Sequence, residues 1–397
     1  MSDRKIRTAV IGMGKMGSRY AGLIASGKVP GMMLSAITRA RPETVESLNR
    51  ECGNIPVFDT AEELFNSVTD GKIPLDSVII ATPHYSHEEI AVKAWQAGLH
   101  VLCEKPAGVY SRQARNMEEA AARSGKVFAV MFQMRTSSVY RELHSIVTSG
   151  RYGNIKRVHW LAAGWYRPEG YYQSSKWHAT WSRDGGGVLL NQCPHNLDIL
   201  QWVCGMPVKV QGFCHEGHYH GIEVEDDVTA YMEWENGATG TFITSTGDAP
   251  SVDRLEIFLD EALIVCENGL LRVSELEPEL NQKEADYRKN SKEYFRTIKG
   301  TPRDVSLSPG PSDPYLEMLN GFAARLEEEI THEARPDAFT VEGHESRKSL
   351  ILSNAIYLSS WEKKMIDVPK TGSDGEIRFE TEFEAALTRK ISSSPAT

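Results

Sequence analysis

The sequence has no hydrophobic run approaching the roughly 18 residues that a membrane-spanning helix needs. It has only six cysteines, which lie apart without a CxxC pair; this argues against a disulfide framework or a zinc knuckle and predicts reduced thiols. Basic residues are outnumbered, and the formal net charge of -10 disfavours a nucleic-acid backbone as a partner. The first residues lack the apolar core and cleavage site of a secretory signal. We therefore expect a cytoplasmic protein that binds neither a membrane nor nucleic acid.

The length and composition suffice for two domains. With 397 residues, of which 41% are hydrophobic and 25% charged, each domain can bury a core of its own. Strand and helix signals alternate until about residue 132, which predicts a doubly wound parallel sheet. Beyond that point, alternating runs and the hairpin signal Asn236-Gly237 predict an open, mostly antiparallel sheet. The expected fold class is α/β, with one domain over residues 1–132 and an α+β domain for substrate binding and oligomerisation over 133–397.

The expected elements follow these two patterns. In the first half we expect strands at 6–11, 32–38, 57–58, 77–81, 101–103 and 127–131, and helices at 18–25, 61–68, 86–97 and 111–124. In the second half we expect strands at 156–163, 208–214, 228–234, 238–244, 254–259 and 262–267, and helices at 139–149, 315–329 and 341–363. Residues 275–312 are polar and predict a surface excursion or lid, and about 25 residues at the end are expected to fray.

A glycine-rich turn, GMGKMG, directly follows the first strand and opens a helix. In this context Gly12, Gly14 and Gly17 allow a tight turn and a close approach of the backbone to a pyrophosphate, whose charge the helix N-terminus attracts. Lys15 and Met16 stand between the glycines and belong to the same candidate contact surface. The turn predicts a Rossmann domain that binds NAD or NADP. The alternative is a glycine turn that serves only the fold.

The end of the second strand, about 20 residues after the glycines, is where this fold contacts the adenosine ribose. An acidic residue there would repel a 2′-phosphate, but the chain has Thr38, Arg39 and Arg41. We therefore expect NADP to be favoured over NAD. The alternative is that the arginines are solvated surface, and that backbone and threonine contacts hold NAD.

Two later loops leave the carboxyl ends of parallel strands, the edge at which such sheets bind ligands. The candidate cofactor contacts in and after these loops are Thr82, Pro83, His84, His87, Glu104 and Lys105. The two histidines also have a plainer interpretation as ordinary loop residues.

The stretch GGGVLLNQCPHNLD, residues 185–198, contains a second polar motif. Asn191 and His195 are spaced by four residues, which on one helix places them on the same face, towards a cleft. The opposite face is expected to be buried through Leu190, Leu197, Leu200 and Trp202. The three glycines are expected to leave room for a close-fitting substrate. The alternative is a glycine hinge before a core helix with one structural histidine.

An aromatic segment, WYRPEGYYQSSKWHATW, precedes that stretch and is too interspersed with polar residues for a single strand or helix face. Aromatic faces beside arginines and tyrosine hydroxyls suit a sugar or glycoside. The candidate substrate-binding residues are Lys105, Arg135, Trp165, Tyr166, Tyr172, Trp177, Arg183, Asn191 and His195. The alternative is a loop packed against its own core.

Three histidines, His215, His218 and His220, stand close together after one of the expected strands. They invite a metal interpretation, but no cysteine or further ligand pattern accompanies them. A polar strand edge or loop is the preferred interpretation, and no metal is expected.

The order and distances of GMGKMG, EKP and GGGVLLNQCPHNLD resemble those of the Gfo/Idh/MocA oxidoreductases over most of the chain. The resemblance implies a nicotinamide-binding domain, a second domain whose open sheet often supports oligomers, here a dimer or tetramer, and reversible oxidation of a sugar or polyol. By matching motif positions it implies that Lys105 and His195 are catalytic. Many members carry Asp where this chain has Asn191, and a neutral amide cannot exchange a proton.

The resulting hypothesis gives His195 the role of base, with Asn191 orienting the substrate hydroxyl and Lys105 stabilising the developing oxyanion while the nicotinamide takes hydride. The substrate is expected to be a neutral sugar, inositol or glycoside, with C3 of a glucose-type ring as one candidate. A ketosugar or nucleotide-sugar reductase and a lyase or hydrolase that uses NAD transiently remain alternatives within the enzyme class. A non-catalytic dinucleotide sensor is an alternative outside it.

Overall fold

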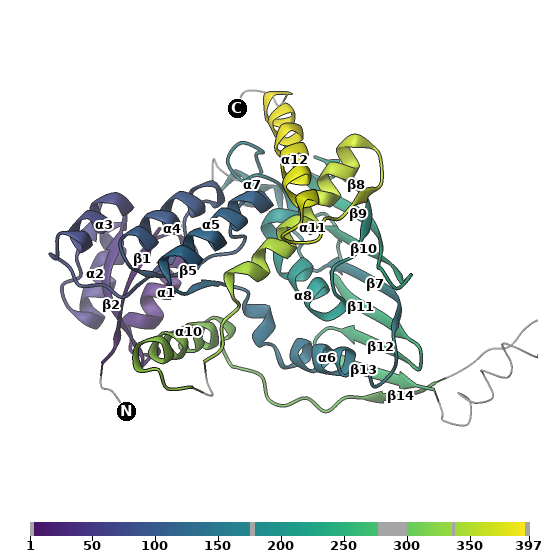
Figure 1. Cartoon of the computed structure of the whole chain (residues 1–397), viewed down its shortest axis with the longest axis horizontal. Helices are drawn as coiled ribbons and strands as arrows, with labels where there is room; N and C mark the ends of the chain where they lie inside the picture. Colours follow the sequence, from purple (N-terminus) through teal and green to yellow (C-terminus); the bar gives the residue numbers. More distant parts are fainter. Residues whose placement is uncertain (1–3, 175–178, 277–299, 336–337, 394–397) are drawn as a thin grey trace, which may run out of the picture.

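The computed structural model describes residues 4–174, 179–276, 300–335 and 338–393. It contains a six-stranded sheet and a nine-stranded sheet, with helices around the first and on one face of the second (Figure 1). This architecture confirms the expected fold class. None of the helices among these residues is both long and apolar enough to cross a bilayer. All six cysteines are free thiols, as expected.

The first sheet is entirely parallel, with the strand order β3-β2-β1-β4-β5-β6. Its strands are β1 Ile6–Ile11, β2 Met32–Thr38, β3 Val57–Phe58, β4 Ser77–Ile80, β5 His100–Cys103 and β6 Phe128–Val130. Its helices are α1 Lys15–Ala25, α2 Pro42–Cys52, α3 Ala61–Thr69, α4 His87–Gln96 and α5 Ser111–Ser124. Helices on both faces bury the central strands, which is why these strands are continuous hydrophobic runs. The strand order reverses between β1 and β4, where doubly wound sheets bind ligands at their carboxyl edge.

The second sheet is mixed, because β7 and β10 are parallel while its other strand pairs are antiparallel. Its order is β14-β13-β12-β11-β7-β10-β9-β8-β15. Its strands are β7 Ile155–Ala163, β8 Lys209–Glu216, β9 Glu225–Glu233, β10 Thr239–Ser245, β11 Val252–Leu259, β12 Ala262–Glu267, β13 Leu270–Glu275, β14 Thr301–Asp304 and β15 Ile366–Asp367. Helices α6 (Ser138–Thr148), α8 (Pro194–Cys204) and α11 (Gly343–Glu362) cover one face, and the described residues place no helix on the other (Figure 1).

The structure adds a helix that the sequence did not predict and corrects the expectation for the chain end. Helix α2 was not expected, because Leu48 is its one fully buried residue and leaves little apolar periodicity. The segment 275–312 was expected to be a surface excursion or lid: its described part includes the exposed edge strand β14, which pairs with β13, and its residues 277–299 lie outside the described part of the chain. The chain end does not fray over Asp374–Ser393, which forms α12 with Phe379 and Phe383 buried.

The C-terminal helices join the two halves. The backbone N–H of Val130 in β6 donates to the carbonyl oxygen of Val341 at 2.9 Å, and the N–H of Ser111 at the start of α5 donates to Oδ1 of Asn354 in α11 at 2.9 Å. Helix α10, Pro314–Thr331, also packs against β1 (Figure 1). Residues after 313 thus support the parallel sheet, and the division at residue 132 remains a proposal.

Candidate active site

The glycine turn after β1 has the geometry that a dinucleotide requires. Gly12 has a φ of 91°, and a Cβ there would lie 2.6 Å from the carbonyl oxygen of Ala81. A Cβ on Gly17 would lie 1.8 Å from the carbonyl oxygen of Gly12, so the third glycine lets α1 pack closely. Gly14 faces open space at the N-terminus of α1, where no side chain caps the helix. Open space beside an uncapped helix N-terminus fits a pyrophosphate, so the residues present fit a bound NAD(P).

The glycines at 185–187 are required by the packing of the protein itself. A Cβ on Gly186 would lie 2.3 Å from the hydroxyl of Tyr357, and a Cβ on Gly187 would lie 1.8 Å from the carbonyl oxygen of Glu225. The side chain of Glu225, buried on β9, accepts hydrogen bonds from the N–H groups of Gly187 and Leu189 at 2.8 and 2.9 Å. These contacts explain the glycines by the packing of the protein, and the expectation that they leave room for substrate stays a prediction. They let the segment lie against β9 and α11.

The stretch that carries Asn191 and His195 is not one helix. Residues Val188–Gln192 form a π-helical turn, η3, and α8 begins at Pro194. Proline has no N–H to donate, so it cannot continue the hydrogen-bond ladder of the turn before it. Asn191 therefore lies in the π turn and His195 in the first turn of α8, and the expected common helix face is wrong. Leu190, Leu197 and Leu200 are buried as expected and Trp202 is partly buried, but α8 has no exposed polar face, because its other residues are buried as well.

The loop after β5 brings Lys105 to this stretch. The ammonium group of Lys105 donates a hydrogen bond to the backbone carbonyl oxygen of Asn191 at 2.9 Å. Glu104 is buried beside it and accepts hydrogen bonds from the backbone N–H of Lys105, at 3.0 Å, and from the hydroxyl of Tyr20. The structure thus brings together Lys105 from the first half and Asn191 from the second, at the carboxyl edge of the parallel sheet.

Burial dominates the electrostatics of this cluster. It holds the pKa of the His195 imidazole well below its ordinary 6.5, and the charge of Lys105 adds to the shift. It also lowers the pKa of the Lys105 ammonium from 10.5, although the carboxylates of Glu104 and Asp184 oppose that change. The pKa of Glu104 is raised from 4.5 by burial, against the opposing charge of Lys105. At neutral pH the imidazole of His195 is therefore neutral, and it lies beside the amine of Lys105.

Sequence reasoning missed Gln133, which contacts His195, and Tyr315, which contacts Gln133. The side-chain amide of Gln133, in the 3-10 turn Gln133–Thr136 after β6, donates to Nε2 of His195 at 3.0 Å and to the hydroxyl of Tyr315 at 3.0 Å. The donor at Nε2 makes this the unprotonated ring nitrogen, the one that can accept a proton. The available signal was a polar residue three positions after a parallel strand, at the edge where ligands bind.

A third missed residue, Asp184, orients Asn191. Asp184 is 2% exposed and accepts hydrogen bonds from Nδ2 of Asn191 at 3.1 and 3.3 Å. Oδ1 of Asn191 accepts a hydrogen bond from the hydroxyl of Tyr171 at 3.5 Å. The amide is thus held with its nitrogen towards a carboxylate and its oxygen towards a phenol. The signal in the sequence was a carboxylate directly before the three glycines.

Comparison with protein families accounts for both halves of this site. Residues 6–132 match the family described as "Oxidoreductase family, NAD-binding Rossmann fold", and residues 140–265 match "GFO/IDH/MocA C-terminal domain". The chain belongs to the Gfo/Idh/MocA oxidoreductases.

The individual relatives of the chain share little sequence identity with it. The D-glucoside 3-dehydrogenase of Escherichia coli (strain K12) is 27% identical over 242 residues, which cover 59% of this chain and 64% of that protein. The 1,5-anhydro-D-fructose reductase of Ensifer adhaerens is 26% identical over 216 residues, which cover 53% of this chain and 64% of that protein. These matches span less than two thirds of either relative's length.

A solved structure is similar over almost the whole chain. The WlbA dehydrogenase from Bordetella pertussis, in complex with NADH and UDP-GlcNAcA, superposes with a TM-score of 0.74 at 23% identity. The superposition covers 93% of this chain and 99% of that one. At this identity the likeness shows the fold alone.

The residues that we expected to contact the adenosine ribose of the cofactor lie in different environments. Thr38 is 3% exposed, and its hydroxyl accepts a hydrogen bond from the N–H of Gly12 at 3.1 Å, so it supports the glycine turn. Arg39 is exposed, and its Nε donates to the carbonyl oxygen of Asp59 at 2.9 Å. Exposed candidates at the same edge are Lys15, Pro83 and Arg41, while Met16 is partly buried.

The two histidines of the loop after β4 lie inside the protein. His87 is 0% exposed, and its ring nitrogens lie 2.7 Å from the carbonyl oxygen of Thr82 and 2.9 Å from that of Pro106. Burial lowers the pKa of His87 to about 4. His84 is 7% exposed, with Nδ1 2.9 Å from the carbonyl oxygen of Asp184. The histidines therefore connect loops of the site, and their contact with the cofactor stays a prediction.

The aromatic segment approaches the site through one short helix, α7 (Glu169–Gln173). Tyr171 on α7 reaches Asn191, and the guanidinium of Arg167 lies 5.1 Å from the centre of the Tyr171 ring. The hydroxyl of Tyr172 instead bonds to that of Thr246 at 2.7 Å. Tyr171, which was not among the substrate-binding candidates, is thus better placed than Tyr172.

The other candidates from the aromatic segment are more peripheral. Trp165 is partly buried, and Tyr166 is 50% exposed. Arg183 is exposed, and Trp177 lies outside the described residues. The segment therefore does not form one continuous aromatic surface over its described part.

Arg135 lies behind the site. Its guanidinium pairs with both carboxylate oxygens of Asp198, at 2.8 and 2.6 Å, and with Glu345 at 2.9 Å. The ring of Trp202 lies 5.0 Å from the same guanidinium. These buried pairs tie α8 to the turn after β6 and to α11, so we assign Arg135 a supporting role in place of substrate contact.

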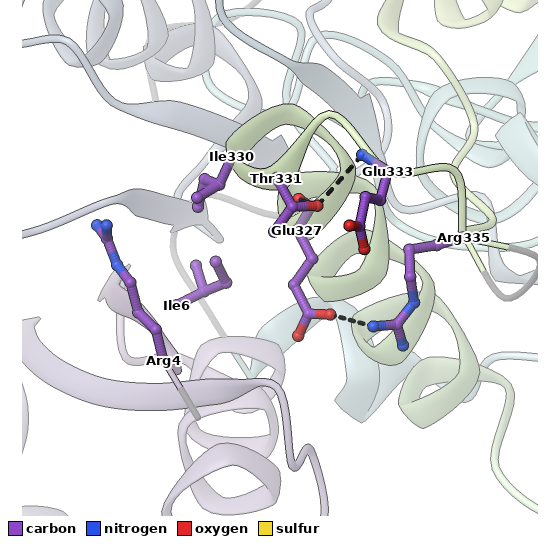
Figure 2. Close-up of a pocket in the computed structure, with 7 residues that line it drawn as sticks. All are labelled: Arg4, Ile6, Glu327, Ile330, Thr331, Glu333 and Arg335. Atoms are coloured by element: carbon purple, nitrogen blue, oxygen red, sulfur yellow. Dashed lines mark hydrogen bonds and ion pairs between the residues drawn. The ribbon is translucent and has the colours of Figure 1, made fainter. Parts of the chain in front are cut away.

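A surface hollow of about 300 Å³ lies at the opposite edge of the parallel sheet, between the start of β1 and the end of α10 (Figure 2). Arg335 pairs there with Glu327, and the N–H of Glu333 donates to Thr331, as Figure 2 shows. Arg4 pairs with Asp76 at 2.9 Å. The hollow is thus lined by residues at the amino end of β1, away from the carboxyl edge that holds Lys105.

Proposed function

We propose that this protein is an NAD(P)-dependent dehydrogenase that oxidises a secondary hydroxyl of a sugar, glycoside or inositol. The observation that carries the proposal is that Lys105 reaches the segment of Asn191 and His195, donating to the Asn191 carbonyl oxygen at 2.9 Å, at the edge of a sheet whose glycine turn fits a dinucleotide. Burial keeps the imidazole of His195 neutral there. A dinucleotide sensor would not need both Lys105 and His195. Gly12, Gly14 and Gly17 would hold the pyrophosphate on α1, and the bound cofactor supplies the hydride acceptor at its nicotinamide ring.

The reacting hydroxyl meets three groups of the chain. It replaces the Gln133 amide at Nε2 of His195, and the imidazole takes its proton. The ammonium of Lys105 stabilises the negative charge that develops on the oxygen. Asn191, held by Asp184, orients the hydroxyl without exchanging a proton. Asp184 thereby places a carboxylate beside the position where many family members carry Asp.

The relatives support a neutral sugar as substrate. Their names include a glucoside 3-dehydrogenase and an anhydrofructose reductase, both of which act on uncharged sugar rings. Tyr171 offers aromatic surface beside Asn191 for such a ring. We therefore propose a glucoside or inositol, with C3 of a glucose-type ring as the oxidised carbon.

A panel assay tests the substrate class. Purified protein with NAD or NADP should reduce its cofactor with neutral glucosides or inositols, and product NMR should locate the new ketone at C3. The His195→Ala variant serves as the blank for contaminating dehydrogenases. Activity confined to sugar phosphates or uronates would overturn the substrate class, and cofactor binding without turnover of any panel member would favour the sensor.

We further propose that NADP binds more tightly than NAD. Arg39 and Arg41 are exposed at the ribose edge, and Arg41 stands at the N-terminus of α2 without capping it by a side-chain hydrogen bond. A 2′-phosphate would find a helix N-terminus and two guanidinium groups there. The carboxylate of Glu43, in the first turn of α2, lies 3.9 Å from the guanidinium of Arg41, and a 2′-phosphate would compete with it for this arginine.

Replacement of Arg39 should separate the two cofactors. A charge-assisted hydrogen bond contributes about 1.5 to 3 kcal/mol to binding. Arg39→Ala should therefore lower the affinity for NADP by roughly tenfold or more and leave the affinity for NAD nearly unchanged. Fluorescence titration of both cofactors measures the effect, with the exposed Arg50→Ala on the same helix as control. An equal loss of affinity for NAD and NADP would contradict the proposal that Arg39 binds the 2′-phosphate.

The remaining proposals concern assembly and location. The face of the nine-stranded sheet away from α6, α8 and α11 exposes Leu161 and Phe213, at 37% and 52%. Apolar side chains on an uncovered sheet face suit a contact between copies, so we propose a homo-oligomer, a dimer or tetramer. Six free thiols are compatible with the reducing cytoplasm that the sequence led us to expect.

A further inference from the structure

The turn that joins β8 to β9 is held in one conformation by a buried carboxylate. Asp226 is 0% exposed and accepts hydrogen bonds from the consecutive N–H groups of His218, Tyr219 and His220, at 2.8, 2.9 and 3.0 Å. It also lies 2.8 Å from Nδ1 of His220. The backbone at His218 is therefore fixed by a group that points into the protein.

On the outer side of the same turn, three potential metal ligands come together. His215 and Asp227 are direct partners in the antiparallel register, and Nδ1 of His215 lies 2.8 Å from Oδ2 of Asp227. Nδ1 of His218 lies 3.7 Å from the same carboxylate oxygen. The ligand atoms of the three side chains all lie within 4.8 Å of one another. No other group of three such side chains is found in the described part of the chain.

We propose that His215, His218 and Asp227 form a site for a divalent transition-metal ion, with Zn²⁺ as the reference ion. Two imidazoles and one carboxylate are ligands that zinc accepts, and three protein ligands leave one tetrahedral position for water. The side chains are 55%, 47% and 20% exposed, so the ion and its water can enter from solvent. Coordination through Nδ1 places the ring proton of each histidine on Nε2.

The third histidine of the sequence motif is not a ligand. Nδ1 of His220 lies 2.8 Å from Asp226, and its Nε2 lies 2.8 Å from the carbonyl oxygen of Arg167. The ring of His220 also lies 4.9 Å from that of Tyr172. His220 thus connects the turn to the aromatic segment beside the candidate active site. An ion at the outer side of the turn would stiffen the element on which that segment rests.

The alternative is an ordinary surface pair between His215 and Asp227. Two features distinguish the proposed site from such a pair. A second histidine, His218, faces the same carboxylate oxygen, and the backbone of that histidine is fixed by Asp226 in advance of binding. Pre-positioned ligands lose little conformational freedom when they bind an ion.

Zinc titration of the untagged, chelator-treated protein tests the site. Calorimetry should find one ion per chain, and the ion should raise the melting temperature. His215→Ala and Asp227→Asn should each lower the affinity for zinc. Loss of a residue that only supports a ligand lowers metal affinity by roughly 10- to 100-fold, and loss of a ligand itself should lower it by more. His344→Ala is the matched control, because His344 is an exposed histidine that also lies near a carboxylate, 3.3 Å from Glu345.

Other results would overturn the assignment. Zinc binding that survives in both ligand variants, or is lost to the same extent in His344→Ala, would show adventitious binding elsewhere. One ion per two chains would show an ion shared between copies in place of a site within one chain. Because the three side chains lie at the surface, the metal-free variants should melt at the wild-type temperature, and this measurement separates loss of the site from loss of the fold.

Discussion

Replacement of His195 by Ala should lower turnover by about 10² to 10⁴, the usual contribution of a positioned base. The imidazole is neutral because burial and the charge of Lys105 hold its pKa well below 6.5, so its loss removes the proton acceptor. Cofactor affinity should stay close to that of the wild type, because the proposed contact of His195 is with the reacting hydroxyl alone. Steady-state assays with saturating cofactor and one confirmed sugar measure the effect.

The pH profile makes this prediction specific to His195. The base must be neutral, so kcat/KM should stay level as the pH falls through 6.5 and decline only below it, at the lowered pKa. This acid limb should disappear in His195→Ala. The exposed His344→Ala should keep wild-type turnover and profile. Near wild-type turnover of His195→Ala across pH 6 to 9 would falsify the assignment and leave α8 a structural helix.

Replacement of Lys105 by Met should lower turnover by about 10² to 10³, the range seen when one donor to a developing oxyanion is removed. Methionine keeps an unbranched stem of similar length and removes the charge. Since the ammonium must be protonated, wild-type activity should fall at high pH, through a pKa below 10.5. This alkaline limb should be absent from the variant.

A second effect of the same substitution links Lys105 to His195. The charge of Lys105 lowers the pKa of His195, so Lys105→Met should move the acid limb of the profile upwards. A role limited to packing would leave that limb in place. Lys93→Met, at an exposed lysine of α4 that pairs with Glu62 and Glu89, is the control and should change neither rate nor profile. An unmoved acid limb would contradict the proposed proximity of the two groups.

Much of the fold was predictable because it rests on local patterns. Strands 6–11, 32–38 and 262–267 and helix 111–124 were expected with the bounds that the structure has. The central parallel strands are buried on both faces and are therefore continuous hydrophobic runs. Helix α2 was missed because it buries Leu48 alone. The sequence did carry a signal for α12, since Phe379, Phe383 and Leu387 follow one another at intervals of four residues and are all buried.

The candidate site was only partly predictable. Lys105, Asn191 and His195 stand in short motifs, and the structure gathers Lys105 and Asn191 as expected. The prediction that Asn191 and His195 share a helix face was wrong, because Pro194 interrupts the backbone hydrogen bonds of the helix and a π turn precedes it. The local signal for this break was the proline itself.

The sequence by itself determined the two-sheet architecture, the dinucleotide turn and the motif residues, because each depends on hydrophobic periodicity or on a few neighbouring residues. The tertiary structure alone decided which groups surround them. Asp184 and His84, which form a hydrogen bond, are 100 residues apart in the sequence, and Gln133 and His195 are 62 apart. The partner of His215 is Asp227 and not the nearby His220. Such contacts follow from how strands and helices pack, and no local pattern encodes the partner of a side chain that lies so far along the chain.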